Sequence, residues 1–214
     1  MADRAQAAEQ LAAGRTRLPP GRHGLSSDFV AENQRERLLN GLVEAVAADG
    51  YNATTIGRIA EASKISRRTF YEHFEGKEEC FLAAYEMIDT HVGAAMLAAA
   101  GPKEPWSERV RSRLAALLDV LSRDPAVARF YLVEPLAAGG EVAARYRDAM
   151  QLLAELLRPD SGPSGVDAEV RDQALMGGIA TLIRRRLNAG DAVSIPDLLP
   201  DLVDLSTRDL LLKN

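Results

Sequence analysis

Two adjacent arginines in the segment SRRTFYEHF, residues 66–74, are the side chains in this sequence best suited to binding an anion or a base. Ser66 is a favoured N-cap residue, so Arg67 and Arg68 would lie in the first turn of a short helix, where the helix dipole disfavours each cation by about 0.3–1 kcal/mol. A recognition helix enters the major groove by its N-terminal residues, and arginine pairs bidentately with guanine O6 and N7. The pair therefore indicates a contact with DNA.

The charge around this segment differs from that of the whole chain. The 214 residues carry a formal net charge of -5 at pH 7. Between residues 64 and 77, four cations face two acids, 4 − 2 = +2; they are Lys64, Arg67, Arg68 and Lys77 against Glu72 and Glu75. A local basic patch is typical of a DNA footprint. The alternative is a solvated helix start without a partner.

The elements that must position the arginines follow from the spacing of apolar residues. Phe70 and Phe74 lie four apart and would face inward, which places Arg68 and Glu72 on the opposite side. A helix over 28–49 precedes them, ended by a glycine. Thr54 or Thr55 would cap a second helix, and a turn of about three residues around Lys64 would join it to the third, as in a helix-turn-helix.

Composition and length predict an all-α protein. A hydrophobic share of 47% supports a core, and the many Ala, Leu, Glu and Arg residues favour helix. The single Cys80 excludes an intramolecular disulfide, and the N-terminus lacks the pattern of a signal peptide. No apolar run approaches the roughly 20 residues that span a bilayer. We therefore expect a cytoplasmic protein without membrane insertion.

Three segments are predicted along the chain. A mobile basic arm over 1–27, in which Arg15, Arg17 and Arg22 could enter a minor groove, precedes a three-helix DNA-binding domain over 28–76. A larger helical domain over 77–214 would bind an effector and dimerise. Its helices are expected from about 77 to 100, 106–123, 126–138, 142–158, 166–188 and 196–212, the last capped by Ser194.

The stretch TTIGRIAEASKISRRTFYEHFEGKEE, residues 54–79, resembles the N-terminal domain of the TetR family of bacterial one-component transcriptional regulators. The resemblance covers about residues 28–85. It implies base-reading positions at Arg67, Arg68 and Thr69 and phosphate contacts at Thr55, Tyr71, His73 and Lys77, and we add Lys64 and Ser66 to the expected DNA-binding set. Lys64 departs from the family, which usually has glycine there; a positive φ would cost lysine about 1 kcal/mol.

The second domain offers two sets of weaker predictions. Met and aromatic side chains suit an apolar ligand, so an effector cavity would be lined by Met87, His91, Trp106, Tyr131, Glu134, Tyr146 and Met150. Two glycines inside a helix favour close helix approach, so a dimer face is expected at Leu175, Gly178, Leu182, Leu198, Leu202 and Leu205. Ordinary core packing is the alternative for each residue.

Other chemistry finds little support. His73 and Cys80 lack the further ligands that zinc requires. His91, Tyr131 and Glu134 have no nucleophile elbow, phosphate loop or metalloprotease motif around them. We therefore expect no metal, no cofactor and no enzymatic activity.

The hypothesis is a ligand-responsive regulator that binds a palindromic operator as a homodimer, acting as a repressor. One rival is a helical small-molecule-binding protein or enzyme in which the DNA-binding motif is vestigial. An activator and a nucleoid-type protein remain alternatives within DNA binding. The effector and the operator are not encoded in any recognisable pattern.

Overall fold

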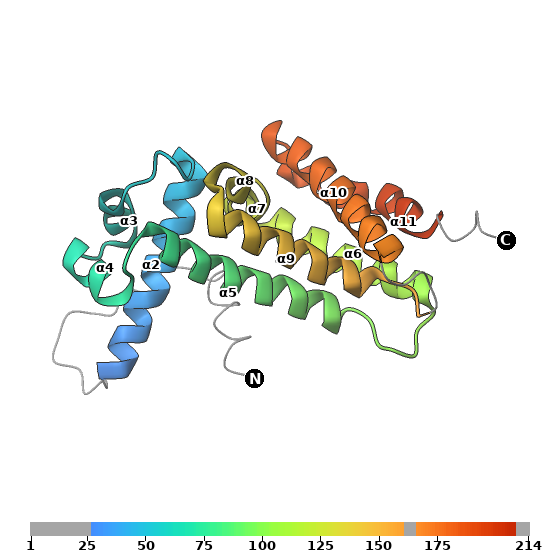
Figure 1. The fold of residues 1–214 in the computed structure, drawn as a ribbon, viewed down its shortest axis with the longest axis horizontal. Coiled ribbons are helices and arrows are strands. Elements are labelled where there is room, and N and C mark those ends of the chain that lie inside the picture. The colour runs from blue at the N-terminus through green and yellow to red at the C-terminus, as the bar shows by residue number, and fades with distance from the viewer. Residues whose placement is uncertain (1–26, 161–165, 209–214) are drawn as a thin grey trace. The chain divides into compact units, whose positions relative to one another are not determined.

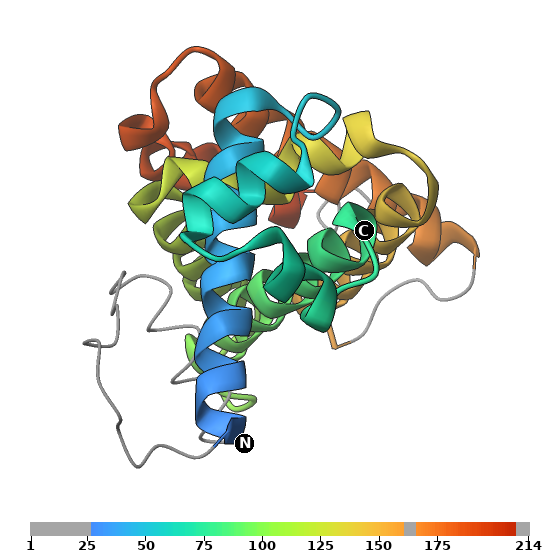
Figure 2. The same ribbon diagram turned by 90° about the vertical axis from the view of Figure 1, so that its left-hand side faces the viewer.

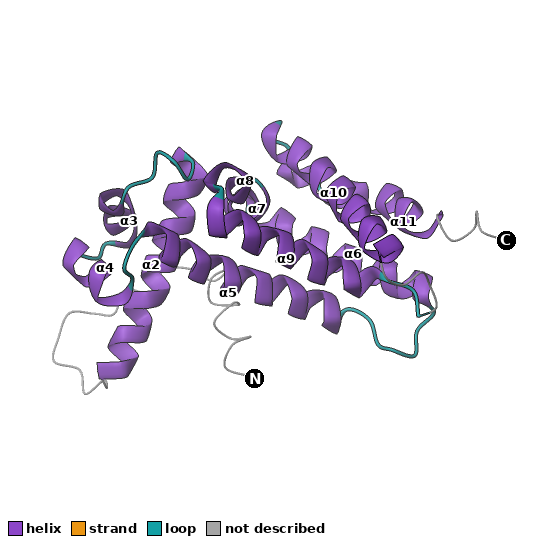
Figure 3. Cartoon of the chain, viewed as in Figure 1, coloured by secondary structure: helices purple, strands orange, loops and turns teal. Residues whose placement is uncertain are grey.

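The computed structural model describes residues 27–160 and 166–208, and every regular element in these ranges is helical (Figure 3). This confirms the all-α prediction, with an N-terminal helix-turn-helix followed by a larger helical part. The predicted basic arm falls outside the described residues except for Ser27, which begins α2. Within the described ranges, no helix combines the length and apolar character needed to cross a membrane.

The contacts divide the chain into two compact units, one up to Ile88 and one from Asp89 onward. The division falls inside α5, Lys77–Ala98, which is one continuous helix (Figure 1). The domain boundary expected after residue 76 stays a prediction. The start of this helix at Lys77 is as the sequence indicated.

The first unit contains α2 (Ser27–Asp49), α3 (Ile56–Ser63), α4 (Arg67–His73) and the first half of α5. In Figure 2, the two short helices lie beside the long α2. The apolar stripe of α2 is fully buried at Leu38, Leu42 and Val46, as its i, i+4 spacing requires. Gly50 ends this helix with a φ of 78°, a conformation that glycine adopts at little steric cost.

Gly41 lets α2 and α3 approach closely. A Cβ atom on Gly41 would lie 2.6 Å from the backbone N of Ser63 and 2.9 Å from its Cα, distances that real Cβ atoms essentially never show. Because these are backbone atoms at the end of α3, no side-chain rotation relieves the contact. The glycine thus fixes how deeply the helix-turn-helix packs on α2.

The second unit continues with α6 (Trp106–Arg123), α7 (Pro125–Leu132), α8 (Glu134–Ala138), α9 (Gly140–Leu157) and α10 (Val166–Asn188). Two 3-10 turns, η1 (Ala192–Ser194) and η2 (Pro196–Leu198), lead into α11 (Leu199–Arg208). Helix α9 packs against α10, and α6 packs against α11. Buried leucines and aromatic residues from these helices form the core of the unit.

Two predicted helices differ in the structure. The helix expected over 126–138 is two helices, α7 and α8, separated at Val133. Pro135 explains the break, because it cannot donate the hydrogen bond that would continue α7. The helix expected over 196–212 begins as the 3-10 turn η2 and becomes α-helical at Leu199; residues beyond 208 lie outside the described part. Ser194 is not its N-cap.

Ser194 instead closes the preceding turn. Its hydroxyl donates to the backbone oxygen of Asp191 at 3.0 Å and also to the Asp191 carboxylate. The Ser194 side chain thus bonds to Asp191, three residues earlier, and does not cap the following helix.

Candidate nucleic-acid interface

The turn between α3 and α4 is a two-bond C-terminal cap built on Lys64. The backbone N–H of Lys64 donates to Glu61 O at 3.1 Å, and that of Ile65 donates to Ala60 O at 3.0 Å, the pattern of a Schellman motif. Lys64 has φ 55° and ψ 41°, and among the described residues it is the non-glycine with positive φ. The positive φ that disfavours a lysine at this position is therefore present.

Helix α4 has a buried aromatic face and an exposed polar face. Ser66 caps it as predicted, with its Oγ accepting from the Thr69 N–H at 3.0 Å. Phe70 and Phe74 are 0% and 3% exposed. On the opposite face, the side chain of Arg68 is 91% exposed and its Nε lies 3.3 Å from Oε1 of Glu72, four residues on.

Three contacts from α2 hold α4 and its turn in place. Gln34 Oε1 lies 3.2 Å from His73 Nε2, within hydrogen-bond distance. The Arg35 guanidinium stacks 5.0 Å from the centroid of the Phe74 ring. Arg37 donates from Nη2 to the oxygens of Ser63 and Lys64, both at 2.8 Å, which satisfies carbonyls at the end of α3. The short helix α4 is therefore fixed by tertiary contacts.

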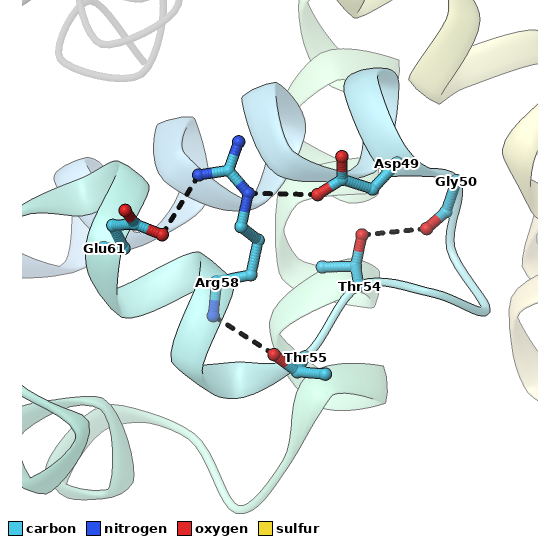
Figure 4. A network of polar contacts seen from close by, with 6 residues as sticks. All are labelled: Asp49, Gly50, Thr54, Thr55, Arg58 and Glu61. Atoms are coloured by element: carbon cyan, nitrogen blue, oxygen red, sulfur yellow. Dashed lines mark hydrogen bonds and ion pairs between the residues drawn. The ribbon is translucent and has the colours of Figure 1, made fainter.

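The N-terminal end of α3 is also tied to α2 (Figure 4). Thr55 is the N-cap, its Oγ1 accepting from the Arg58 N–H at 3.2 Å. The Arg58 side chain pairs with Asp49 at 3.0 Å and with Glu61 at 3.3 Å. The pair with Asp49 joins the first turn of α3 to the last residue of α2, and the pair with Glu61 lies within α3. Arg58 was not predicted from the sequence, because its partner Asp49 is nine residues away in the preceding helix.

Lys77 is engaged within the protein. Its ammonium donates to Tyr51 O at 2.6 Å and to Thr54 O at 2.9 Å, and it lies 4.2 Å from the centroid of the Tyr51 ring. Partial burial lowers the pKa of Lys77 below its usual value. A phosphate contact at this residue stays a prediction, and the backbone N–H groups at the start of α5 suit it better than the ammonium.

The side chains of Arg67 and Tyr71 on α4 have different surroundings. Tyr71 is 59% exposed and meets the Phe70 ring edge-on at 5.6 Å. The guanidinium of Arg67 lies where a Cβ atom on Gly57, in the first turn of α3, would be. In the sequence, a glycine inside a predicted helix indicates that another group approaches closely, but the spacing of residues does not show that this group is Arg67.

The predicted effector residues of the second unit already have polar partners in several cases. Tyr131 is fully buried and donates to Asp89 Oδ1 at 2.7 Å, and Arg145 donates to the other oxygen of Asp89 at 2.9 Å. Arg184 donates to the Tyr146 hydroxyl at 3.0 Å. Trp106 donates to Leu157 O at 3.0 Å.

The remaining effector predictions are distributed over several elements. Glu134 is 5% exposed, and its Oε1 lies 3.9 Å from Nη2 of Arg129. Met150 is buried in α9. His91 is half-buried in α5, and Met87, also half-buried, falls in the first unit. Their role in a ligand site stays a prediction.

The predicted dimer residues divide into buried and accessible ones. Leu198 and Leu202 are 7% and 0% exposed within the single chain, which favours a core role for them. Leu205 is 48% exposed, and its Cδ2 would lie 3.8 Å from a Cβ atom on Gly178. Leu175 and Leu182 are half-buried on α10. Helices α10 and α11 thus share an accessible face around Gly178 and Leu205.

A capped α3, a tight turn and an anchored α4 with exposed arginine define a helix-turn-helix domain of the DNA-binding type. Residues 38–84 match the sequence model of a family that is described as "Bacterial regulatory proteins, tetR family". The helix-turn-helix segment of this chain is thus similar to the N-terminal domain of TetR-family regulators.

Two regulators and one solved structure are similar to this chain over different shares of their length. The regulator TcmR of Streptomyces glaucescens is 37% identical over 81 residues, 38% of this chain and about a third (35%) of TcmR. The transcriptional activator FasR of Mycolicibacterium smegmatis is 24% identical over 166 residues, 76% of this chain and 74% of FasR. The fold is similar to that of the fatty acid degradation regulator FadR from Bacillus halodurans, with a TM-score of 0.71 at 15% identity, covering 81% of this chain and 94% of FadR.

Proposed function

We propose that the protein is a ligand-responsive transcriptional regulator that binds a palindromic operator as a homodimer and represses transcription. The observation that carries the proposal is Arg68, which is 91% exposed at the N-terminal end of a helix that contacts α2 through His73 and Phe74. Such an arginine is free to reach a base edge, since its pairing with Glu72 is a surface ion pair of small net energy.

The residues around Arg68 supply the other DNA contacts in this proposal. Thr69 shares the first turn of α4, and the exposed Tyr71 and the exposed Lys64 flank it on the same surface. Thr55 and Ser66 mark the N-terminal ends of α3 and α4, where anions are favoured. His73, bonded to Gln34, would contact phosphate from the end of α4.

Regulation requires two further sites, both placed by this proposal in the unit from Asp89 onward. A small-molecule effector would bind among Tyr131, Tyr146 and Met150 and change the equilibrium between conformations of different DNA affinity. A second copy of the chain would pack on the face around Gly178 and Leu205. A two-fold dimer presents two recognition helices about 34–36 Å apart, or a multiple of that distance, to successive major grooves.

The test is selection of duplexes from random DNA by the full-length protein, followed by fluorescence-anisotropy binding at two salt concentrations. We expect a palindromic consensus and affinity for it at least about 10³-fold above that for unrelated DNA. Strongly salt-dependent binding without preference would instead identify a nucleoid-type protein. Turnover of a small molecule without any DNA preference would identify the rival enzyme.

The direction of regulation has its own test. A reporter gene placed behind the selected operator should be expressed less when the protein is present. Because the related FasR is described as a transcriptional activator, increased expression in the same assay would replace the repressor assignment while leaving operator binding intact.

A further inference from the structure

Gly57 occupies the first turn of α3, and the guanidinium of Arg67 lies where a side chain on Gly57 would begin. A Cβ atom on Gly57 would lie 3.0 Å from Arg67 Cζ and 3.2 Å from Nε, and closer still to Nη2. A side chain of any size at position 57 would therefore displace the guanidinium. The absence of a side chain at this one position lets Arg67 rest on a neighbouring helix.

The two adjacent arginines consequently have different environments. Arg68 extends away from the protein and is 91% exposed. Arg67 folds back from the start of α4 across the first turn of α3. Both arginines are exposed, but the guanidinium of Arg67 lies beside α3, whereas that of Arg68 lies on the outer face of α4.

The chemistry beside Arg67 suits a phosphate. Thr55, the N-cap of α3, lies in the same turn as Gly57 and bears a hydroxyl group. The positive end of the α3 dipole and the guanidinium lie together, so an anion between them stabilises both. Arginine presents a planar fork that matches a phosphate bidentately.

We propose that Gly57 is a positioning residue that holds Arg67 over the first turn of α3, where Arg67 and Thr55 bind one phosphate of the DNA backbone. Base reading at the start of α4 is then the task of Arg68. This inference rests on the proposed function, because it assigns roles within the same DNA-binding surface.

The test compares Gly57→Ala, Arg67→Ala and the double variant with the wild-type protein. Gly93→Ala is the matched control, since Gly93 also lies inside a helix and a Cβ there would meet nothing within 4 Å. Affinity is measured by fluorescence anisotropy at three salt concentrations. The probes are a duplex selected from random DNA, an unrelated duplex of equal length, and a series in which each base pair of the selected duplex is replaced.

We expect Arg67→Ala to weaken binding to both duplexes by the same factor of about ten and to reduce the salt slope by about one. Sequence preference across the series should be retained. Gly57→Ala should act in the same direction with a loss of about threefold, and the double variant should match Arg67→Ala alone, because the two changes remove one contact. Gly93→Ala should bind as the wild type does.

Two results would overturn the inference: additive losses in the double variant, or a relaxed preference at one base pair in Arg67→Ala. Thermal unfolding separates positioning from folding, because alanine favours helix and Gly57→Ala should keep or raise Tm. A lowered Tm of Gly57→Ala with a parallel loss of binding would show that Gly57 acts in folding and would also overturn the inference.

If the wild-type protein showed no preference among DNA sequences, the proposed function would be overturned instead. The coupling between Gly57→Ala and Arg67→Ala would still be measurable on the unrelated duplex.

Discussion

Arg68 is the side chain whose removal separates base reading from contact with the DNA backbone. Replacing it with alanine removes the exposed fork at the start of α4 and leaves the buried Phe70 face untouched. We expect Arg68→Ala to lose about 1–3 kcal/mol of discrimination at a specific base pair, measured with single-base-pair variants of the selected duplex.

Arg123 provides the matched control for this prediction. It is also an exposed arginine in an i, i+4 ion pair, with Asp119, but it lies in α6 of the second unit. Arg123→Ala makes the same change in net charge and should leave discrimination unchanged. Equal losses on selected and unrelated DNA for Arg68→Ala would contradict base reading by this residue.

Cys80 is a second residue with a direct test. It is fully buried, and burial, with a contribution from Glu79, raises the pKa of its thiol to about 12. Because the thiolate is the reactive form, the native protein at pH 8 should not react with a thiol reagent, and unfolding in guanidinium should expose one thiol per chain. Rapid labelling of the native protein would show that α5 opens locally.

The same thiol affects stability at alkaline pH. Its pKa in the folded state lies above its value in the unfolded chain, so the folded state retains the proton longer. Stability is unaffected below the unfolded pKa, near 9, and falls as the pH rises from there toward 12. Cys80→Ala, compared with wild type in urea at pH 7 and pH 10, should remove that part of the pH dependence.

Local residue patterns predicted part of this surface. The Ser66 cap and the turn at Lys64 depend on neighbours within five residues, so they could be predicted from sequence, whereas sequence left the cap of α3 open between Thr54 and Thr55. The contacts of Lys77 with residue 51 and of Arg67 with residue 57 depend on how separate helices meet. No spacing rule contains that information.

Among the elements, the junction of α2 with α3 is the most tightly constrained. We expect Gly41→Ala to destabilise the protein by about 1–3 kcal/mol, because its Cβ would overlap backbone atoms of Ser63. Gly93→Ala, in open space on α5, should instead stabilise it by about 0.5–1 kcal/mol. Urea unfolding of both variants measures the difference, and equal effects would contradict the close approach of the two helices.

Helix positions were largely predictable from apolar spacing and caps, and the exceptions have local causes. A proline at 135 splits one predicted helix into α7 and α8. A 3-10 turn replaces the first turn of another, where Ser194 bonds to Asp191. In both places the spacing of apolar residues continues without a break, but a local feature of the backbone or a side chain ends or changes the helix.

At the scale of the whole molecule, the proposed dimer depends on an accessible apolar residue. Leu205→Arg would place a charge in the face shared by α10 and α11, and an unpaired charge is costly to bury. We expect the variant to sediment as a monomer and to lose at least about tenfold in operator affinity.

Leu136→Arg is the control for this change. Leu136 is 53% exposed on α8, so it has similar exposure at a different surface. It should sediment and bind as the wild type does. A dimeric Leu205→Arg would move the proposed interface to another face, and monomers in both variants would indicate general destabilisation.

The uninterrupted helix α5 has a consequence for chimeric regulators. The matched family segment ends at residue 84, inside this helix, and the boundary between the two units along the chain falls between Ile88 and Asp89. Each residue inserted into an α-helix turns the C-terminal part of the chain by about 100° and shifts it by about 1.5 Å. A DNA-binding half grafted from another regulator must therefore join this chain in the same helical phase, and a one-residue error would act as a rotation of one half against the other.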